Sequence, residues 1–284
     1  MTPLRRAAWI ALLTYAIQTV MSIGAFHFMV GRPVPTGFDA DLWARGYAFG
    51  MTHMGALMIA TGFLAAVFTV ADHVGWRRGL RAALAVVVLT LSVELVGAWT
   101  GVPFGDHAYG GQLVWLVLGL VPLVIPLSWF LMLVASLGIA LRFSRGPVVT
   151  LCLTALGLFA WDVLMEPAMS AAYPFWVWRS SGVYHGMPIA NWLSWLVIGP
   201  VIAWTLRRVA GPALEQLATD PLAPALYALT GLLPLALALE FGLYGAAALG
   251  GAAMVIYLVA PRVPGVILAR SSAPPADPRA PAAT

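Results

Sequence analysis

Long apolar stretches run through most of this chain and constrain its fold more than any other feature. A helix that crosses the hydrocarbon core of a bilayer needs about 20 mostly apolar residues. The sequence contains eight candidates, at 7–30, 47–70, 80–99, 113–141, 148–169, 191–206, 222–239 and 242–260. We therefore predict an all-α, polytopic membrane bundle of about eight transmembrane helices.

The charge content excludes a soluble globular fold. Only 9% of the 284 residues are charged and 61% are hydrophobic, whereas about a quarter of an average soluble domain is charged. So few charges cannot cover a surface that faces water. We predict one membrane helical domain over residues 1–270, and a disordered tail over residues 271–284, which are rich in Pro and Ala.

The basic residues predict the orientation of the bundle. All 15 are arginines, and they occur in small groups between the apolar stretches rather than in a continuous patch that would suit nucleic acid. With the N-terminus inside, twelve arginines fall on the cytoplasmic side, and Arg32, Arg45 and Arg179 fall outside. The positive-inside rule then predicts cytoplasmic N- and C-termini. The first apolar stretch is too long for the core of a signal peptide, which is the alternative for Arg5 and Arg6.

Acidic side chains inside the predicted spans converge on the outer leaflet. Glu94, Asp162 and Glu166 lie near the outer ends of the third and fifth spans. Because carboxylates within a bilayer are costly, they usually mark function. Asp162 and Glu166 are four residues apart and share one helical face, where their charges repel unless one carries a proton. For Glu240, at the outer end of the seventh span, the simpler interpretation is a carboxylate that reaches the interface.

Further polar and aromatic residues collect on the same side. Two outer loops, at 101–111 and 173–191, combine turn-forming residues with hydrogen-bonding groups, as binding loops do. His27 and His53 lie at helix ends, and for them a structural role as hydrogen-bonding groups between helices is a simpler interpretation than catalysis. Eight of the twelve tryptophans also fall outside, which suggests either a biased interfacial belt or a cavity walled by indoles. The candidates for binding substrate or orienting water are Asp106, His107, Tyr184, His185, Asn191, Trp99, Trp161, Trp176, Trp178 and Trp195.

The sequence carries no signature of a bound cofactor or metal. It lacks the glycine-rich phosphate loops GxxxxGK[ST] and GxGxxG and the zinc motif HExxH. The single cysteine, Cys152, lies in an apolar stretch. His107 and His185 could join the carboxylates as metal ligands, but their spacing does not require it. We predict neither a metal nor a cofactor.

Two long stretches resemble the bacterial membrane carotenoid 1',2'-hydratases. The first reads VELVGAWTGVPFGDHAYG over 93–110 and continues in VPLVIPLSWF over 121–130. The second reads AWDVLMEPAMSAAYPFWVWRSSGVYHGMPIANWLSW over 160–195. The family pattern runs E-x-x-G-x-x-x-G-x-PFG, WD-x-x-x-DP, W-x-W and G-x-YYGVP-x-x-N-x-x-GW. The resemblance covers about a hundred residues, and outside it only hydropathy matches.

The chain departs from that pattern at four positions. Glu166 stands where the family has Asp, His185 where it has Tyr, Met187 where it has Val, and Ser194 where it has Gly. Glu166 keeps a carboxyl group. His185 replaces a phenol with an imidazole, which puts any role of the phenol in doubt.

The resemblance implies hydration of the terminal 1',2' double bond of lycopene or γ-carotene in a bacterial plasma membrane. The substrate partner would be a carotenoid dissolved in the bilayer. Such a reaction starts by protonating the alkene, so it needs a carboxylic acid that stays protonated and aromatic faces for the resulting cation. We expect Asp162 to donate the proton, and Glu166 and Glu94 to hold its charge state and the water. A second carboxylate or His185 would orient that water and take its proton.

The sequence leaves three alternative functions open. A carotenoid cyclase also protonates an alkene and differs only in what captures the cation. A prenyltransferase needs paired Asp-rich motifs for Mg²⁺ and diphosphate, of which only the Asp162/Glu166 spacing is a faint example. A transporter or carotenoid-binding scaffold would also explain intramembrane carboxylates, although the sequence shows no internal repeat.

Overall fold

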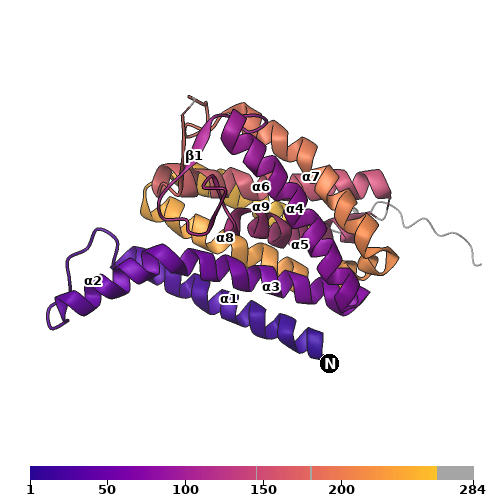
Figure 1. Ribbon diagram of the computed structural model, residues 1–284, viewed down its shortest axis with the longest axis horizontal. Coiled ribbons are helices and arrows are strands. Elements are labelled where there is room, and N and C mark those ends of the chain that lie inside the picture. The colour runs from indigo at the N-terminus through magenta and orange to yellow at the C-terminus, as the bar shows by residue number, and fades with distance from the viewer. Residues whose placement is uncertain (145, 180, 261–284) are drawn as a thin grey trace, which may run out of the picture.

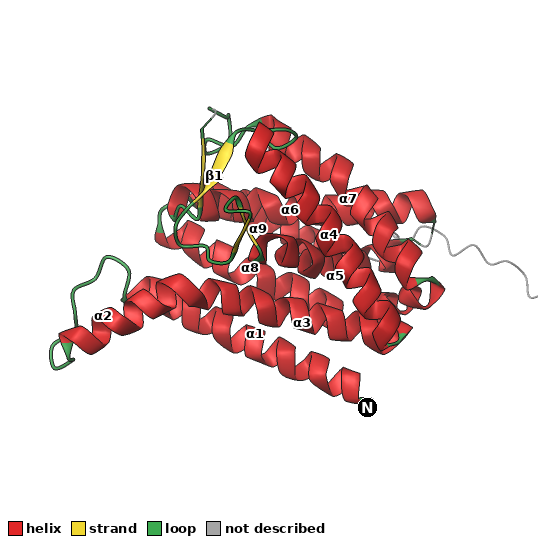
Figure 2. Ribbon diagram, in the orientation of Figure 1, coloured by secondary structure: helices red, strands yellow, loops and turns green. Residues whose placement is uncertain are grey.

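The computed structural model describes residues 1–144, 146–179 and 181–260, so the predicted tail lies outside the described residues. The chain forms an all-α membrane bundle with short strands at one end (Figures 1 and 2). Within those ranges, seven helices are long and apolar enough to cross a membrane, and an eighth apolar helix has 16 residues. The elements are α1 (Pro3–Phe28), α2 (Ala40–Phe49), η1 (Gly50–Met54), α3 (Gly55–Val74), α4 (Trp76–Thr100), β1 (His107–Tyr109), β2 (Leu116–Val117), β3 (Val121–Pro122), α5 (Val124–Phe143), α6 (Pro147–Pro167), η2 (Ala168–Ala172), β4 (Trp176–Trp178), α7 (Ile189–Ala210), η3 (Pro212–Thr219), α8 (Leu222–Glu240) and α9 (Tyr244–Val259).

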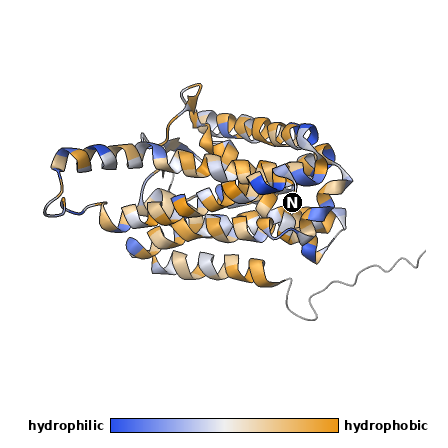
Figure 3. Ribbon diagram, turned by 90° about the horizontal axis from the view of Figure 1, so that it is seen from below, coloured by the Kyte–Doolittle hydropathy of each residue, from blue (hydrophilic) through white to orange (hydrophobic). Residues whose placement is uncertain are grey.

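Helix α5 forms the centre of the bundle, as Figure 1 shows. It packs against α3, α4, α6 and α8, and most of its residues are buried. Helix α1 lies outside α3 and also contacts α8, whereas α7 packs on α4 and α6, and α9 on α6 and α8. Hydrophobic residues follow the helix bodies, and hydrophilic ones gather toward the helix ends (Figure 3). This distribution suits helices that cross a bilayer.

Polar contacts close the bundle at the end predicted to be cytoplasmic. Asp220, whose side chain is fully buried, accepts one hydrogen bond from Arg5 of α1 at 2.5 Å and pairs with His73 of α3 at 2.7 Å. Its backbone carbonyl accepts a bond from Arg142 of α5, and its other carboxyl oxygen caps α8 through the Leu222 N–H. Through its carboxylate and its backbone carbonyl, Asp220 thus ties four helices together.

A second ion pair lies at the opposite end. Glu240, at the end of α8, pairs with His27 of α1 at 2.8 Å and with Arg32 at 3.4 Å. All three side chains are partly exposed, so Glu240 is placed as a carboxylate at the membrane boundary would be. His27 contacts a carboxylate of another helix, which is the structural role that we expected for it.

Small residues let the helices approach closely. A Cβ atom on Gly250 of α9 would lie 2.6 Å from the Leu164 backbone of α6, and one on Gly157 of α6 would lie 2.5 Å from the Tyr257 ring of α9. Because lipid tails are as apolar as the side chains, such close backbone contact is a main source of cohesion between membrane helices.

The fourth predicted span, 113–141, is wrong at its start. The helix α5 begins only at Val124, and the preceding residues form the β2–β3 hairpin, in which Leu116 pairs with Pro122 and Val117 with Val121. Gly119, with φ of 72°, forms part of the turn between them. Hydropathy alone cannot separate a helix from an apolar hairpin, because both present continuous apolar sequence.

The second predicted span, 47–70, is longer in the structure than expected. Helix α2, the π-helical turn η1 and α3 follow one another without a break over Ala40–Val74, and this helical unit has 35 residues. Its α2 end protrudes from the bundle at the left of Figure 1. None of the α2 residues is buried. The unit exceeds the length needed to cross a bilayer, so α2 extends beyond the span.

Candidate active site

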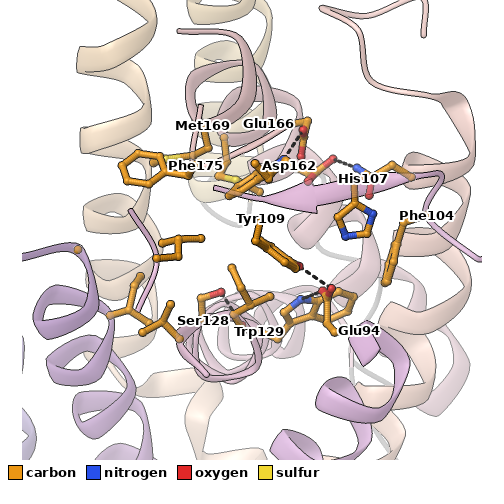
Figure 4. Close-up of a pocket in the computed structure, with 18 of the residues that line it drawn as sticks. Glu94, Phe104, His107, Tyr109, Ser128, Trp129, Asp162, Glu166, Met169 and Phe175 are labelled. Carbon is orange, nitrogen blue, oxygen red and sulfur yellow. Dashed lines mark hydrogen bonds between the residues drawn. The ribbon is translucent and has the colours of Figure 1, made fainter. Parts of the chain in front are cut away.

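A cavity of about 160 Å³ lies at the strand-bearing end of the bundle (Figure 4). Glu94 of α4 and Asp162 and Glu166 of α6 all line it. Each of the three residues is at most 5% exposed. The carboxyl groups that the sequence singled out therefore line one cavity.

A two-stranded ribbon brings the two outer loops together over this cavity. Strand β1 pairs antiparallel with β4, so that His107 faces Trp178 and Tyr109 faces Trp176. Because side chains alternate along a strand, these four residues share one face of the ribbon. All four line the cavity.

Glycines allow the chain to turn from α4 into the ribbon. Gly101 ends α4 with φ of 76°, a left-handed conformation that disfavours residues with a Cβ atom. Gly105 has φ of 114°, and a Cβ atom there would lie 2.4 Å from Cγ of Pro188. The first outer loop thus packs directly against the start of α7, where Asn191 is located.

Glu94 is held by two donors. Nε1 of Trp129 donates to one carboxyl oxygen at 2.9 Å, and the Tyr109 hydroxyl contacts the other at 2.7 Å. Trp129 is itself buried and stacks on Trp195 with ring centroids 4.1 Å apart. These contacts fix Glu94 against an aromatic wall made by α5 and α7.

Glu166 accepts hydrogen bonds from both indoles of the ribbon. Nε1 of Trp176 and Nε1 of Trp178 donate to the same oxygen, Oε1, at 2.8 and 2.6 Å. An indole N–H is a donor only, so Oε1 must be an acceptor. The sequence WVW thereby fixes β4 to α6 through a single carboxyl oxygen.

Asp162 lies one helical turn before Glu166 and is fully buried. Its Oδ2 accepts a hydrogen bond from the Asn191 side-chain amide at 3.1 Å. Its Oδ1 makes no hydrogen bond to any described residue. The indoles of Trp192 and Trp195 approach this carboxyl, but neither forms a hydrogen bond of good geometry with it. Asp162 thus keeps one buried carboxyl oxygen without a hydrogen bond beside a largely apolar cavity.

His107 is the buried imidazole of the cavity. It is 5% exposed, and its Nδ1 lies 2.9 Å from the carbonyl oxygen of Gly105. Its ring packs on Trp178, with centroids 5.2 Å apart. Burial lowers the pKa of His107 below its ordinary value, in spite of the hydrogen bond to Gly105. The imidazole is therefore neutral at neutral pH.

The structure places four of the predicted site residues away from the cavity lining. Trp99 is 81% exposed, and Asp106 forms an exposed ion pair with Arg179 at 3.4 Å. Tyr184 donates to the Val163 carbonyl at 2.9 Å and so holds the second loop on α6. His185 is exposed beside it. The remaining predicted residues all line the cavity; they are Glu94, His107, Trp161, Asp162, Glu166, Trp176, Trp178, Asn191 and Trp195.

Among the cavity residues that sequence reasoning missed, two polar ones contact Glu94. Tyr109 belongs to the first outer loop, and its spacing of two from His107 was a usable sign if that loop formed a strand. Trp129 lay within a predicted span on a helix without carboxylates, so nothing local distinguished it. Both contact Glu94.

The other part of the cavity is apolar. Met58 and Ile59 of α3, Val124 and Ile125 of α5, and Met169 of η2 line it. Figure 4 shows Met169 and Phe175 on the side away from Glu94. The cavity thus combines acidic and indole groups with apolar side chains that suit a hydrocarbon. Across the described ranges, no three His, Cys, Asp or Glu side chains are grouped closely enough to hold a metal ion.

Fold and site together define a multi-pass membrane protein with a buried acidic and aromatic pocket. The chain belongs to the carotenoid biosynthesis protein family, whose model matches residues 54–257. It is also 32% identical over 154 residues to the bisanhydrobacterioruberin hydratase of Haloarcula japonica. That alignment covers 52% of this chain and 50% of the relative, so the chain spans about half the length of this curated relative. No solved structure matches the chain.

Proposed function

We propose that this protein is a carotenoid hydratase. It adds water across the terminal 1',2' double bond of acyclic or monocyclic carotenoids, such as lycopene or γ-carotene, and forms a 1'-hydroxy end group. The family match and the similarity to a protein named as a hydratase support this class of reaction. The observation that carries the proposal is the unengaged Oδ1 of the buried Asp162 in an indole-walled cavity.

The chemistry begins with Asp162. Its protonated carboxyl donates to C2' of the alkene, and the electrons of the π bond form the new C–H bond. The tertiary cation left at C1' is stabilised by the electron-rich faces of the indoles, each worth about 0.5–2 kcal/mol. The oxygen of a water molecule then bonds to C1', and the water loses a proton. Glu94 and Glu166, each held by indole N–H donors, supply the negative potential around the cation.

The cavity size fits one end of such a substrate. An engineered cavity of about 150 Å³ in another protein holds one benzene, so 160 Å³ holds a terminal isoprene unit. A C40 polyene is far larger, and the rest of it would remain among apolar helices and lipid. Met58, Ile59 and Val124 supply the apolar wall against which the end of the chain would lie.

The location follows from the same reasoning. We infer a bacterial plasma-membrane protein with cytoplasmic termini and a cavity in the outer half of the bilayer. The substrate is itself lipid-soluble, so it would enter between helices and never cross water. The carotenoid is the only partner that this proposal requires.

The test is expression in a bacterium that makes lycopene and contains no other carotenoid-modifying enzyme. Wild-type protein should yield a pigment heavier by one water. Asp162→Asn keeps the shape and an acceptor for Asn191 but removes the acid, so we expect at least about a 100-fold loss of product. Asp41→Asn, an exposed carboxylate on α2, is the matched control and should leave product formation unchanged.

Three results would contradict the proposal. Unchanged lycopene in cells that contain folded wild-type protein would favour a scaffold or transporter. A cyclised pigment of unchanged mass would identify a cyclase. Wild-type conversion by Asp162→Asn would remove Asp162 from the role of proton donor.

A further inference from the structure

We propose that His107 is the base that takes the proton from the attacking water. This inference rests on the proposed hydratase function and names the group that completes it. The sequence alone suggested a carboxylate or His185 for this role. The geometry of the cavity points to another histidine.

The hydrogen bond to Gly105 determines which nitrogen of His107 is available. A carbonyl oxygen only accepts, so the Nδ1 that lies 2.9 Å from it must carry the hydrogen. In a neutral imidazole the other nitrogen, Nε2, then has a lone pair. No described residue hydrogen-bonds to Nε2. His107 therefore has a free acceptor, and the backbone fixes its tautomer.

The position of His107 suits this role. It lines the same cavity as Asp162 but belongs to the ribbon rather than to α6. Tyr109 and Trp178 pack on its ring, at centroid distances of 5.4 and 5.2 Å, and limit its rotation. Asp162 on α6 would therefore protonate C2', and His107 on the ribbon would take the proton from the water that bonds to C1'.

The other acceptors of the cavity are more fully engaged. Both oxygens of Glu94 are hydrogen-bonded, to Trp129 and Tyr109. Glu166 accepts hydrogen bonds from two indoles through Oε1, which leaves its Oε2 as an alternative acceptor. An experiment must therefore distinguish Oε2 of Glu166 from Nε2 of His107 as the base. His185 is exposed and does not line the cavity.

The surroundings of His107 keep its imidazole neutral, so that Nε2 can accept a proton. Burial lowers its pKa, and the nearby Asp106 and Arg179, which pair with each other outside the cavity, shift it in opposite directions. The titratable groups that share the cavity with it are Glu94 from α4, Tyr109 from β1, and Asp162 and Glu166 from α6. The carboxylates among them stabilise the imidazolium once it forms.

The proton balance closes with these two residues. Asp162 gives its proton to C2', and water bonds to C1' through an oxygen lone pair. The O–H bond breaks, its electrons stay on oxygen, and the proton moves to Nε2 of His107. The product is the tertiary alcohol, and the enzyme holds a carboxylate and an imidazolium. Transfer of the proton from His107 back to Asp162 restores the starting state without an oxidant or reductant.

The decisive variant is His107→Asn. Its amide N–H occupies roughly the position of Nδ1 and retains the bond to Gly105, whereas the group equivalent to Nε2 is gone. With purified protein and lycopene in liposomes, we expect kcat to fall by at least about 100-fold, with KM changed less than about threefold. Wild-type kcat/KM should fall at acid pH as the imidazole gains its proton, and this acid limb should vanish in the variant. His27→Asn, a histidine outside the cavity, is the matched control.

The outcomes separate this inference from the proposed function. If wild-type protein hydrates lycopene and His107→Asn has the same kcat and pH profile, the base is not His107 but the function stands. If Glu166→Gln alone abolishes the acid limb, Glu166 is the base. If His185→Asn loses the activity that His107→Asn keeps, His185 is the base. A wild-type protein that leaves lycopene unchanged overturns both proposals.

Discussion

The hydrogen bonds to Glu94 predict a stability difference between two substitutions at that position. In Glu94→Ala, the buried N–H of Trp129 loses its acceptor, and the Tyr109 hydroxyl loses its partner. In Glu94→Gln, the amide oxygen still accepts from Trp129, and the amide N–H can donate to the Tyr109 oxygen. Both variants remove the carboxylate, so the cost of burying its charge cancels from the comparison.

The magnitude follows from these two contacts. An unsatisfied buried donor costs about 1–3 kcal/mol, and a lost neutral hydrogen bond costs about 0.5–1.5 kcal/mol. We therefore expect Glu94→Ala to be less stable than Glu94→Gln by about 2–4 kcal/mol. Trp129 is 3% exposed, so its N–H counts as a buried donor.

The assay is reversible unfolding of the two purified variants in the same detergent, followed by tryptophan fluorescence and circular dichroism. The stacked pair Trp129/Trp195 provides a local signal, because its rings lie 4.1 Å apart. Equal free energies of unfolding, within about 0.5 kcal/mol, would refute the argument that Glu94 organises this wall of the cavity.

Two further predictions concern the bundle. Burial raises the pKa of Asp220, but hydrogen bonds from His73 and Arg5 outweigh it and bring the pKa to about 2. Because this pKa is below the unfolded value of about 4, the stability that Asp220 contributes is present above pH 4 and lost as pH falls toward 2. Unfolding titrations from pH 7 to 2 should show this loss in wild-type protein and not in Asp220→Asn. Gly250→Ala should destabilise the bundle by about 1–3 kcal/mol, because its Cβ atom would meet the Leu164 backbone at 2.6 Å. Gly245→Ala on the same helix, where a Cβ atom meets nothing within 4 Å, is the control, and equal thermal stability of the two variants would contradict the packing argument.

Hydropathy predicted the helical bundle well, because burial in lipid requires long apolar stretches with internally satisfied backbones. It failed at residues 113–123, where an apolar hairpin continues into α5. Trp115 and Leu118 have φ of 60° and 52° there, conformations incompatible with a right-handed helix. No feature of apolar composition signals that change.

The part of the candidate site that depends on residues close together in the sequence was predictable. The spacing of Asp162 and Glu166 places both on one helical face, and the cost of carboxylates in a membrane marks them as unusual. The pairing of β1 with β4 was not predictable, because it joins residues about 70 positions apart through backbone hydrogen bonds that any side chains permit. That pairing moves His107 into the cavity, whereas His185 stays exposed.

The amino-acid sequence by itself determines that this chain folds as a helical membrane bundle with costly acidic groups near one end of its spans. It does so because helix length, apolar content and i,i+4 spacing act over short distances along the chain. Only the tertiary structure decides which side chains share the cavity and which oxygen or nitrogen atoms remain unengaged there. Those outcomes depend on contacts between α4, α6, α7 and the ribbon. Each such contact joins segments that are far apart in the sequence, so the residues of one segment cannot determine it.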